Sequence, residues 1–167
     1  VQKEFKVINL INGYRSRGHL FTKTNPVRDR RTYRPTLSIE NFGLTNDDLN
    51  TTFNAGDIIG LGPQPLSVII SHLEEIYCDS IGVEYMYIRK PEIISWIQQK
   101  LNINNNQPKF SSSQKRKLMT KLIEAVSFEN FLHTKYVGQK RFSLEGGESL
   151  IPALDILIEE AARKGVE

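Results

Sequence analysis

The 167-residue sequence has one cysteine, one tryptophan and no long apolar run. A single cysteine excludes an internal disulfide framework and fits a reducing compartment. Because Asp79 directly follows Cys78, and a carboxylate does not activate a thiol, we expect Cys78 to pack near a helix end. No segment approaches the roughly 20 apolar residues that cross a bilayer, and the start has no signal-peptide pattern. The sequence therefore predicts no membrane partner.

Basic and acidic residues nearly balance over the whole chain, with a net charge of +3. The first 40 residues, however, hold nine Lys or Arg against three acidic residues. Such an excess could bind nucleic acid or an acidic protein surface. Without a nucleic-acid-binding motif, a solvated or subunit-facing loop is favoured, and no nucleic-acid partner is predicted. The loop between Phe21 and Pro35 has no periodicity and contains Arg28, Arg30, Arg31 and Arg34.

Recognisable catalytic constellations are also missing. The sequence has no Ser-His-Asp order, no Cys/His ligand set and no phosphate loop. Gly60-x-Gly62 is half of a dinucleotide fingerprint, but the prolines that follow lack amide donors, so this piece is predicted to be a turn. His72 near Glu75 has no third ligand, so no metal site is predicted. His19 is expected to cap a helix end or fill a gap.

Helical periodicity dominates what is present. Apolar residues recur at intervals of three and four in residues 2–17, 66–78, 91–104, 111–126 and 150–164, with a further short apolar turn at 128–132. Capping boxes are expected at Thr45 with Asp48 and at Ser111 with Gln114. Residues 81–88 could be extended or begin a helix. Five or six helices with no convincing strand pair predict a mostly α fold.

Residues 127–155 gather the most chemistry in the shortest stretch. A basic pair, Lys140 and Arg141, precedes two acidic residues, Glu145 and Glu148, around a Gly-Gly hinge that leads into a helix. The basic pair could bind a dicarboxylate, because guanidinium and carboxylate groups pair bidentately. Alternatively, Arg141 pairs with Glu145 or Glu148 and holds the turn. The residues alone favour the second reading.

Three runs carry a family resemblance: YRSRGHLF at residues 14–21, IGVEYMYI at 81–88 and HTKYVGQKRFSLEGGESLIPALD at 133–155. Their content and order resemble the decarboxylating first component of the 2-oxoglutarate dehydrogenase complex, an oxidoreductase of the tricarboxylic acid cycle. The resemblance implies a fragment of that enzyme, with an amino-terminal helical region at 1–126. Residues 127–167 would be the lead-in and first helix of an α/β domain that binds thiamine diphosphate.

The resemblance also implies what this segment lacks. The family uses thiamine diphosphate and Mg²⁺, but its substrate and cofactor motifs lie further along, so no catalytic, cofactor-binding or metal-binding residue is expected here, and the fragment alone should be inactive. Lys140, Arg141, Glu145 and Glu148 are expected near the substrate approach. The resemblance assigns no role to the Arg28 to Arg34 loop.

The expected partners are the rest of the polypeptide, a second subunit in a homodimer and a lipoyl-bearing succinyltransferase. The expected compartment is the bacterial cytoplasm or the mitochondrial matrix of a eukaryote. The alternative is a stand-alone helical interaction module that binds an acidic partner through its basic first third.

Overall fold

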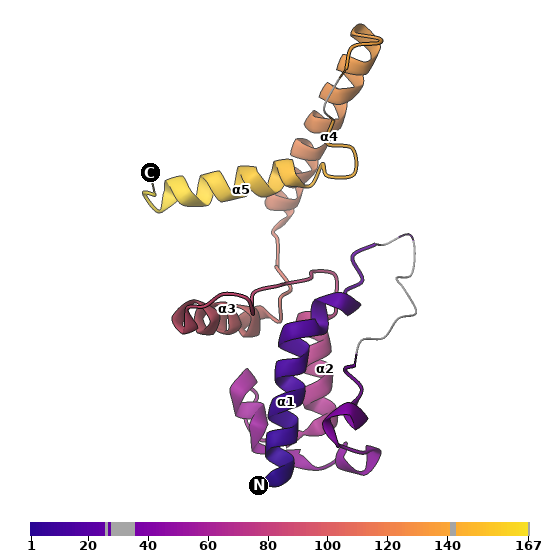
Figure 1. Cartoon of the computed structure of the whole chain (residues 1–167). Coiled ribbons are helices and arrows are strands. Elements are labelled where there is room, and N and C mark those ends of the chain that lie inside the picture. Colours follow the sequence, from indigo (N-terminus) through magenta and orange to yellow (C-terminus); the bar gives the residue numbers. More distant parts are fainter. Residues whose placement is uncertain (26, 28–35, 141–142, 167) are drawn as a thin grey trace. The chain divides into compact units, whose positions relative to one another are not determined.

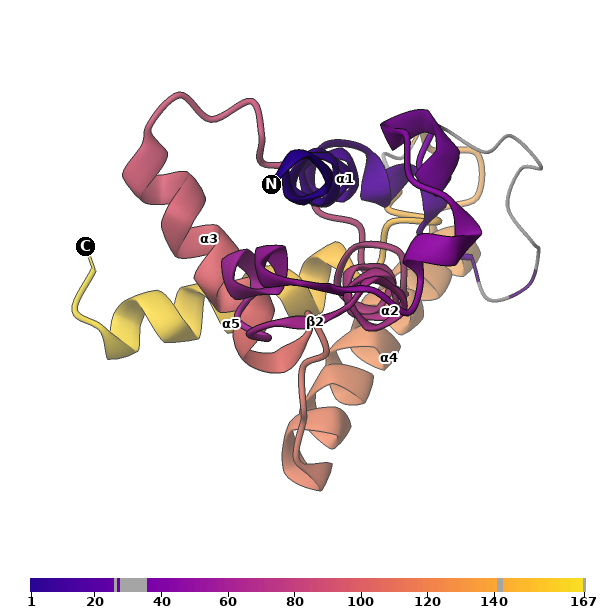
Figure 2. The same cartoon turned by 90° about the horizontal axis from the view of Figure 1, so that it is seen from below.

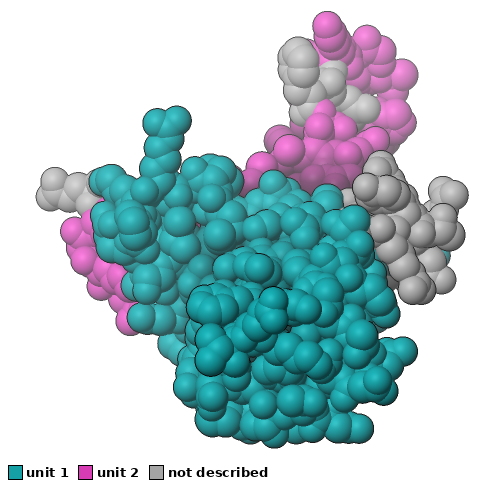
Figure 3. Space-filling model, turned by 60° about the horizontal axis from the view of Figure 1, so that its bottom comes forward, with its two compact units in different colours: residues 1–108 teal, residues 109–167 magenta. Residues whose placement is uncertain are grey.

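The computed structural model describes residues 1–25, 27, 36–140 and 143–166. The chain forms two compact units, unit 1 at Val1–Pro108 and unit 2 at Lys109–Glu167, shown in teal and magenta in Figure 3. Helices predominate in both units, as the sequence predicts. The domain boundary predicted between residues 126 and 127 concerns the domains of a larger enzyme and stays a prediction. None of the helices in the described ranges has the length and hydropathy to cross a membrane.

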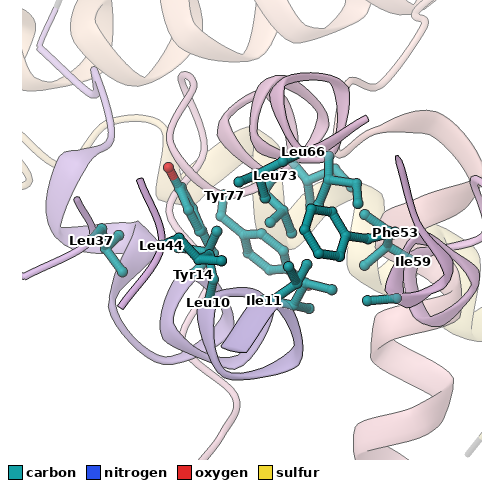
Figure 4. Close-up of a cluster of buried hydrophobic side chains, with 14 of the residues drawn as sticks. Leu10, Ile11, Tyr14, Leu37, Leu44, Phe53, Ile59, Leu66, Leu73 and Tyr77 are labelled. Atoms are coloured by element: carbon teal, nitrogen blue, oxygen red, sulfur yellow. The ribbon is translucent and has the colours of Figure 1, made fainter. Parts of the chain in front are cut away.

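Unit 1 is built around two helices, α1 at Gln2–Arg17 and α2 at Leu66–Tyr77, which run side by side (Figures 1 and 2). The predicted bounds of both helices are confirmed within one residue. Their apolar faces point toward one another and form the core in Figure 4. Fully buried residues are Val7, Leu10 and Ile11 of α1 and Leu66, Ile69, Leu73 and Ile76 of α2.

Short elements connect these two helices. In order they are η1 Gly18–Phe21, η2 Ile39–Phe42, η3 Asn46–Asp48, β1 Thr52–Phe53, η4 Asn54–Ile59 and β2 Gln64–Pro65. The strands β1 and β2 pair antiparallel, with Thr52 opposite Pro65 and Phe53 opposite Gln64. The prediction of no strand pair is therefore wrong, because two-residue strands are too short for apolar alternation to reveal them. The glycine-rich piece that includes Gly60 and Gly62 was predicted to be a turn. It contains the 3₁₀-helix η4 followed by that turn.

A carboxylate holds the start of η3 in place. The predicted capping box of Thr45 and Asp48 is confirmed, and the Lys3 ammonium of α1 also donates a hydrogen bond to the buried Asp48 carboxylate. The hydrogen bond from Lys3, followed by that from the Thr45 backbone, lowers the pKa of Asp48. The contact therefore ties the amino-terminal helix to the loop that leads into β1.

We expect this contact to make unit 1 sensitive to acid. Because the folded pKa of Asp48 lies below its unfolded value, its contribution is present above about pH 3.9 and is lost as pH falls through the folded pKa. Asp48→Asn should lower the urea midpoint of unfolding at pH 6. Between pH 5 and pH 2, the midpoint of this variant should fall less than that of the unsubstituted chain. Asp47→Asn, an exposed neighbour outside the capping box, is the control. If the urea midpoint of Asp48→Asn falls as steeply below pH 5 as that of the unsubstituted chain, this account is wrong.

The third long helix of unit 1, α3 at Pro91–Asn104, covers the core with one face. Ile94, Ile97 and Leu101 pack against the core cluster. Ile93 and Trp96 belong to the apolar pattern that predicts this helix, but they are exposed, because they lie on the outer face of α3. The Lys100 ammonium lies 5.6 Å from the centre of the Trp96 ring. The preceding residues 81–88 form neither of the two predicted elements but an irregular segment.

Unit 2 consists of α4 at Ser112–Lys135 and α5 at Leu150–Arg163 (Figure 1). The predicted capping box of Ser111 and Gln114 is confirmed. The apolar turn predicted separately at 128–132 is continuous with α4. Every residue of α4 is at least partly exposed, and Met119, predicted to fill a gap in a core, is 59% exposed. Unit 2 therefore has apolar residues at helical spacing but encloses few of them.

Candidate functional site

Gly18, in the family-like run at residues 14–21, packs closely against the end of α2 in unit 1. A Cβ on Gly18 would lie 2.6 Å from the Cβ of Tyr77, although the backbone of Gly18 is ordinary helix with φ of −56°. The glycine is therefore needed for close approach between η1 and the end of α2, and not for its backbone conformation.

The contact continues along η1. The His19 imidazole Nε2 lies 3.4 Å from the Glu84 carboxylate, and the Thr22 hydroxyl donates to the His19 carbonyl at 2.7 Å. A Cβ on Gly82 would lie 3.2 Å from the Thr22 hydroxyl oxygen. Residues 14–21 and 81–88 are thus packing partners. His19, which was expected to cap a helix end or fill a gap, places its imidazole against the Glu84 carboxylate.

A buried tyrosine pair completes this junction. The hydroxyl oxygens of Tyr77 and Tyr85 lie 3.1 Å apart, and both rings are at most 2% exposed. Burial, and then the neighbouring Tyr77, raise the pKa of Tyr85. The Tyr85 hydroxyl therefore stays protonated, and the pair forms a structural hydrogen bond within the core.

Beside this junction, unit 1 contains a cleft of about 1050 Å³. Its apolar lining residues include Phe21, Leu37 and Ile39, and its acidic lining residues include Glu74, Glu75 and Asp79. The Tyr14 hydroxyl donates to a Glu74 carboxylate oxygen at 3.4 Å. Burial, followed by the charge of Glu74, raises the pKa of Tyr14, so the phenol stays a hydrogen-bond donor. The sequence did not predict this cleft.

Amide side chains that follow α3 donate hydrogen bonds to the other two carboxylates of the cleft, those of Glu75 and Asp79. Gln107 Nε2 donates to Glu75 at 3.2 Å and to Asp79 at 3.4 Å, and Asn105 Nδ2 donates to Glu75 at 3.0 Å. The run of asparagines was predicted as a turn, and nothing in its pattern indicated the distant carboxylates. Among the described residues, the cleft is lined by Glu74, Glu75 and Asp79 against the single cation Lys23, so its net negative charge would repel a diphosphate. The cleft therefore does not fit thiamine diphosphate.

Cys78 caps α2 at the edge of the cleft, and its predicted packing role near a helix end is confirmed. Burial, and then the charge of Glu74, raise the pKa of the thiol to about 12. We expect iodoacetamide at pH 8 to label the native chain roughly 100-fold more slowly than the urea-unfolded chain, because the thiolate is the reactive form. Mass spectrometry measures both rates. Glu74→Gln, the matched variant, should speed native labelling slightly, and equal rates in folded and unfolded chains would contradict the prediction.

His72 lies in α2 and is partly buried. Burial lowers the pKa of its imidazole, and its Nε2 atom is buried without a hydrogen-bond partner among the described residues. Within those residues, no group of three His, Cys, Asp or Glu side chains could hold a metal ion. His72 is therefore a neutral packing residue in this fold.

The turn before α5 contains two of the four predicted approach residues, Glu145 and Glu148. The Glu148 carboxylate accepts the Gly146 amide at 3.1 Å, and the Leu150 amide donates to the Gly147 carbonyl at 3.0 Å. The amides at this helix start are thus bonded within the turn. Glu145 is exposed, and Lys140 precedes the turn. Arg141 lies outside the described residues, so its predicted pairing and the predicted role of all four residues stay predictions.

The described residues form a mostly helical segment. Its two distinct features are the contact between residues 14–21 and 81–88 and the acidic cleft of unit 1.

No protein-family model matches the chain. Known proteins do, over nearly its whole length. It is 40% identical over 168 residues to the multifunctional 2-oxoglutarate metabolism enzyme of Mycolicibacterium vanbaalenii and 41% identical over 172 residues to the 2-oxoglutarate dehydrogenase E1/E2 component of Corynebacterium glutamicum. It is 39% identical over 168 residues to the 2-oxoglutarate dehydrogenase E1 component of Azotobacter vinelandii.

These matches cover 99–100% of the chain but 13–18% of the relatives' own length. The chain is homologous to a segment of the 2-oxoglutarate dehydrogenase E1 component, in its amino-terminal part. The resemblance of the three runs to that family is confirmed.

Proposed function

We propose that the chain is a non-catalytic scaffold segment of a 2-oxoglutarate dehydrogenase E1 component. The whole enzyme would decarboxylate 2-oxoglutarate on thiamine diphosphate, with Mg²⁺ holding the diphosphate. It would pass the succinyl group to a lipoyl disulfide, which is reduced as the acyl carbon is oxidised. The observation that carries the proposal is the identity of about 40% over the whole chain to proteins with this name.

The scaffold role is supported by the chemistry of unit 1. The side chains of the junction bond to one another, the cleft carboxylates accept amides of the same unit, and His72 and Cys78 are held in unreactive forms. The residues in the family-like runs would therefore position the chain, while the cofactor would be held by the larger part of the enzyme.

The partners follow from the same proposal. They are the remainder of the polypeptide, a second E1 subunit in a homodimer and a lipoyl-bearing succinyltransferase. The enzyme would work in the cytoplasm of a bacterium or in the mitochondrial matrix of a eukaryote. The alternative of a stand-alone module that binds an acidic partner has less support, because Lys3, Lys6, Arg15 and Arg17 each bond to an acceptor within unit 1.

Release of CO₂ from 2-oxoglutarate tests the proposal. The full-length parent protein should release CO₂ in the presence of thiamine diphosphate and Mg²⁺, with pyruvate as the control substrate, and the 167-residue chain should release none under the same conditions. Turnover by the chain alone would overturn the scaffold role. A full-length parent that is inactive on 2-oxoglutarate would overturn the enzyme assignment.

Lys140, Arg141, Glu145 and Glu148 would line the substrate approach in the full-length enzyme. Lys140→Ala and Arg141→Ala should then raise KM for 2-oxoglutarate with little change in kcat, because an approach residue binds ground state and transition state alike. Lys164→Ala, a basic residue beyond α5, is the control. An unchanged KM in both basic variants would remove this assignment.

A further inference from the structure

Ion pairs join the helix α5 to α4. The Lys117 ammonium of α4 pairs with Asp155 at 3.1 Å and also with Glu159, and Lys121 lies 3.7 Å from Asp155. Asp155 and Glu159 are four residues apart and so share one face of α5. These ion pairs fix which side of α5 faces α4.

The opposite side of α5 is apolar and exposed. Four side chains fall at i, i+4, i+7 and i+8, which is one stripe of a helix. We call them the α5 stripe: Leu150, Leu154, Leu157 and Ile158, with exposed fractions of 49%, 42%, 63% and 66%. Exposed apolar surface of this kind is typical of an interaction site.

The orientation of α5 is unusual for a helix pair in isolation. A rotation of α5 about its axis would bring the stripe toward Leu118, the apolar residue of α4 beside Asp155, but would break the ion pairs of Lys117 and Lys121. Most helix stability in proteins comes from packing of the apolar face. The arrangement therefore keeps the stripe available for something other than α4.

We propose that the α5 stripe is a docking surface for another part of the same larger polypeptide, an inference that rests on the proposed function. The relatives are more than five times longer than the matched segment, so more than four-fifths of their length lies outside this chain. A tethered occupant binds at high effective concentration, which suits a small surface.

A second copy of this chain fits the stripe less well. Residues 150–158 extend about 12 Å along the helix axis, whereas a stable interface between separate chains needs about 800 Å² on each partner. Even with the full width of a helix, roughly 10 Å, the stripe is far smaller than that. An intramolecular occupant is therefore favoured.

Hydrogen exchange in the full-length parent protein, compared with the 167-residue chain, tests the docking. The α5 amides should exchange about 100-fold more slowly in the parent, because a covered helix opens less often. Leu157→Lys in the parent should remove that protection. Ala162→Lys, an exposed residue of the same helix, is the matched control and should keep it.

Equal exchange of α5 in the chain and the parent would overturn the inference. So would a chain whose α5 is protected by dimerisation that Leu157→Lys abolishes, since the occupant would then be a second copy. The activity assay separates the two proposals. A parent that releases CO₂ but leaves α5 unprotected refutes the docking alone, and a parent with protected α5 but no turnover refutes the enzyme assignment alone.

Discussion

Replacing Gly56 with alanine is expected to unfold unit 1 or to destabilise it by roughly 3 kcal/mol or more. A Cβ on Gly56 would lie 2.1 Å from the carbonyl oxygen of Gly62, a backbone atom that cannot move without disturbing the pairing of β1 with β2. Urea unfolding followed by circular dichroism and by the fluorescence of Trp96, the single tryptophan, measures the loss.

Gly60→Ala is the matched control for this experiment. Gly60 has a φ of +78°, and an added Cβ meets no atom within 4 Å, so the substitution carries a conformational penalty without a clash. Its expected cost is about 1 kcal/mol. If Gly56→Ala costs no more than Gly60→Ala, then the close approach of the two backbone segments is not required for folding.

Leu73→Ala is expected to lower the free energy of unfolding by about 2–5 kcal/mol. Leu73 is fully buried on α2, where it faces α1 in the core of Figure 4, so truncation leaves a cavity in addition to losing apolar burial. The urea midpoint at pH 7 gives the value.

The neighbouring Val68→Ala serves as the comparison for Leu73→Ala. Val68 lies on the same helix but is 42% exposed, and its truncation should cost less than about 1 kcal/mol. Equal losses for the two variants would mean that burial of Leu73 is not what makes α2 stabilising.

Local signals in the sequence predicted the helices well. The apolar spacing in α1 and α2, the proline that begins α3 and the Ser111 capping box all act within a few residues, and all three predictions are confirmed. The family-like runs were recognised as blocks, but the contact of His19 with Glu84, which joins two of them, was not predicted, because it depends on how distant segments fold together.

The sequence did not predict which apolar faces would be covered. Met119 and Trp96 have the spacing of core residues, yet both are 59% exposed. Periodicity indicates that a face is apolar but not what lies against it, and in this chain α4 and the outer face of α3 have no such cover within the described residues. The acidic cleft was missed for a related reason, since Asn105 and Gln107 join carboxylates some 30 residues away.

The pairing of α1 with α2 has a consequence for biosynthesis. Tyr14 and its partner Glu74 are separated by 60 positions, so α1 leaves the ribosome well before α2 and cannot pack against it until the loop region and most of α2 have been translated. During that interval the apolar face of α1 stays accessible to chaperones and to neighbouring nascent chains.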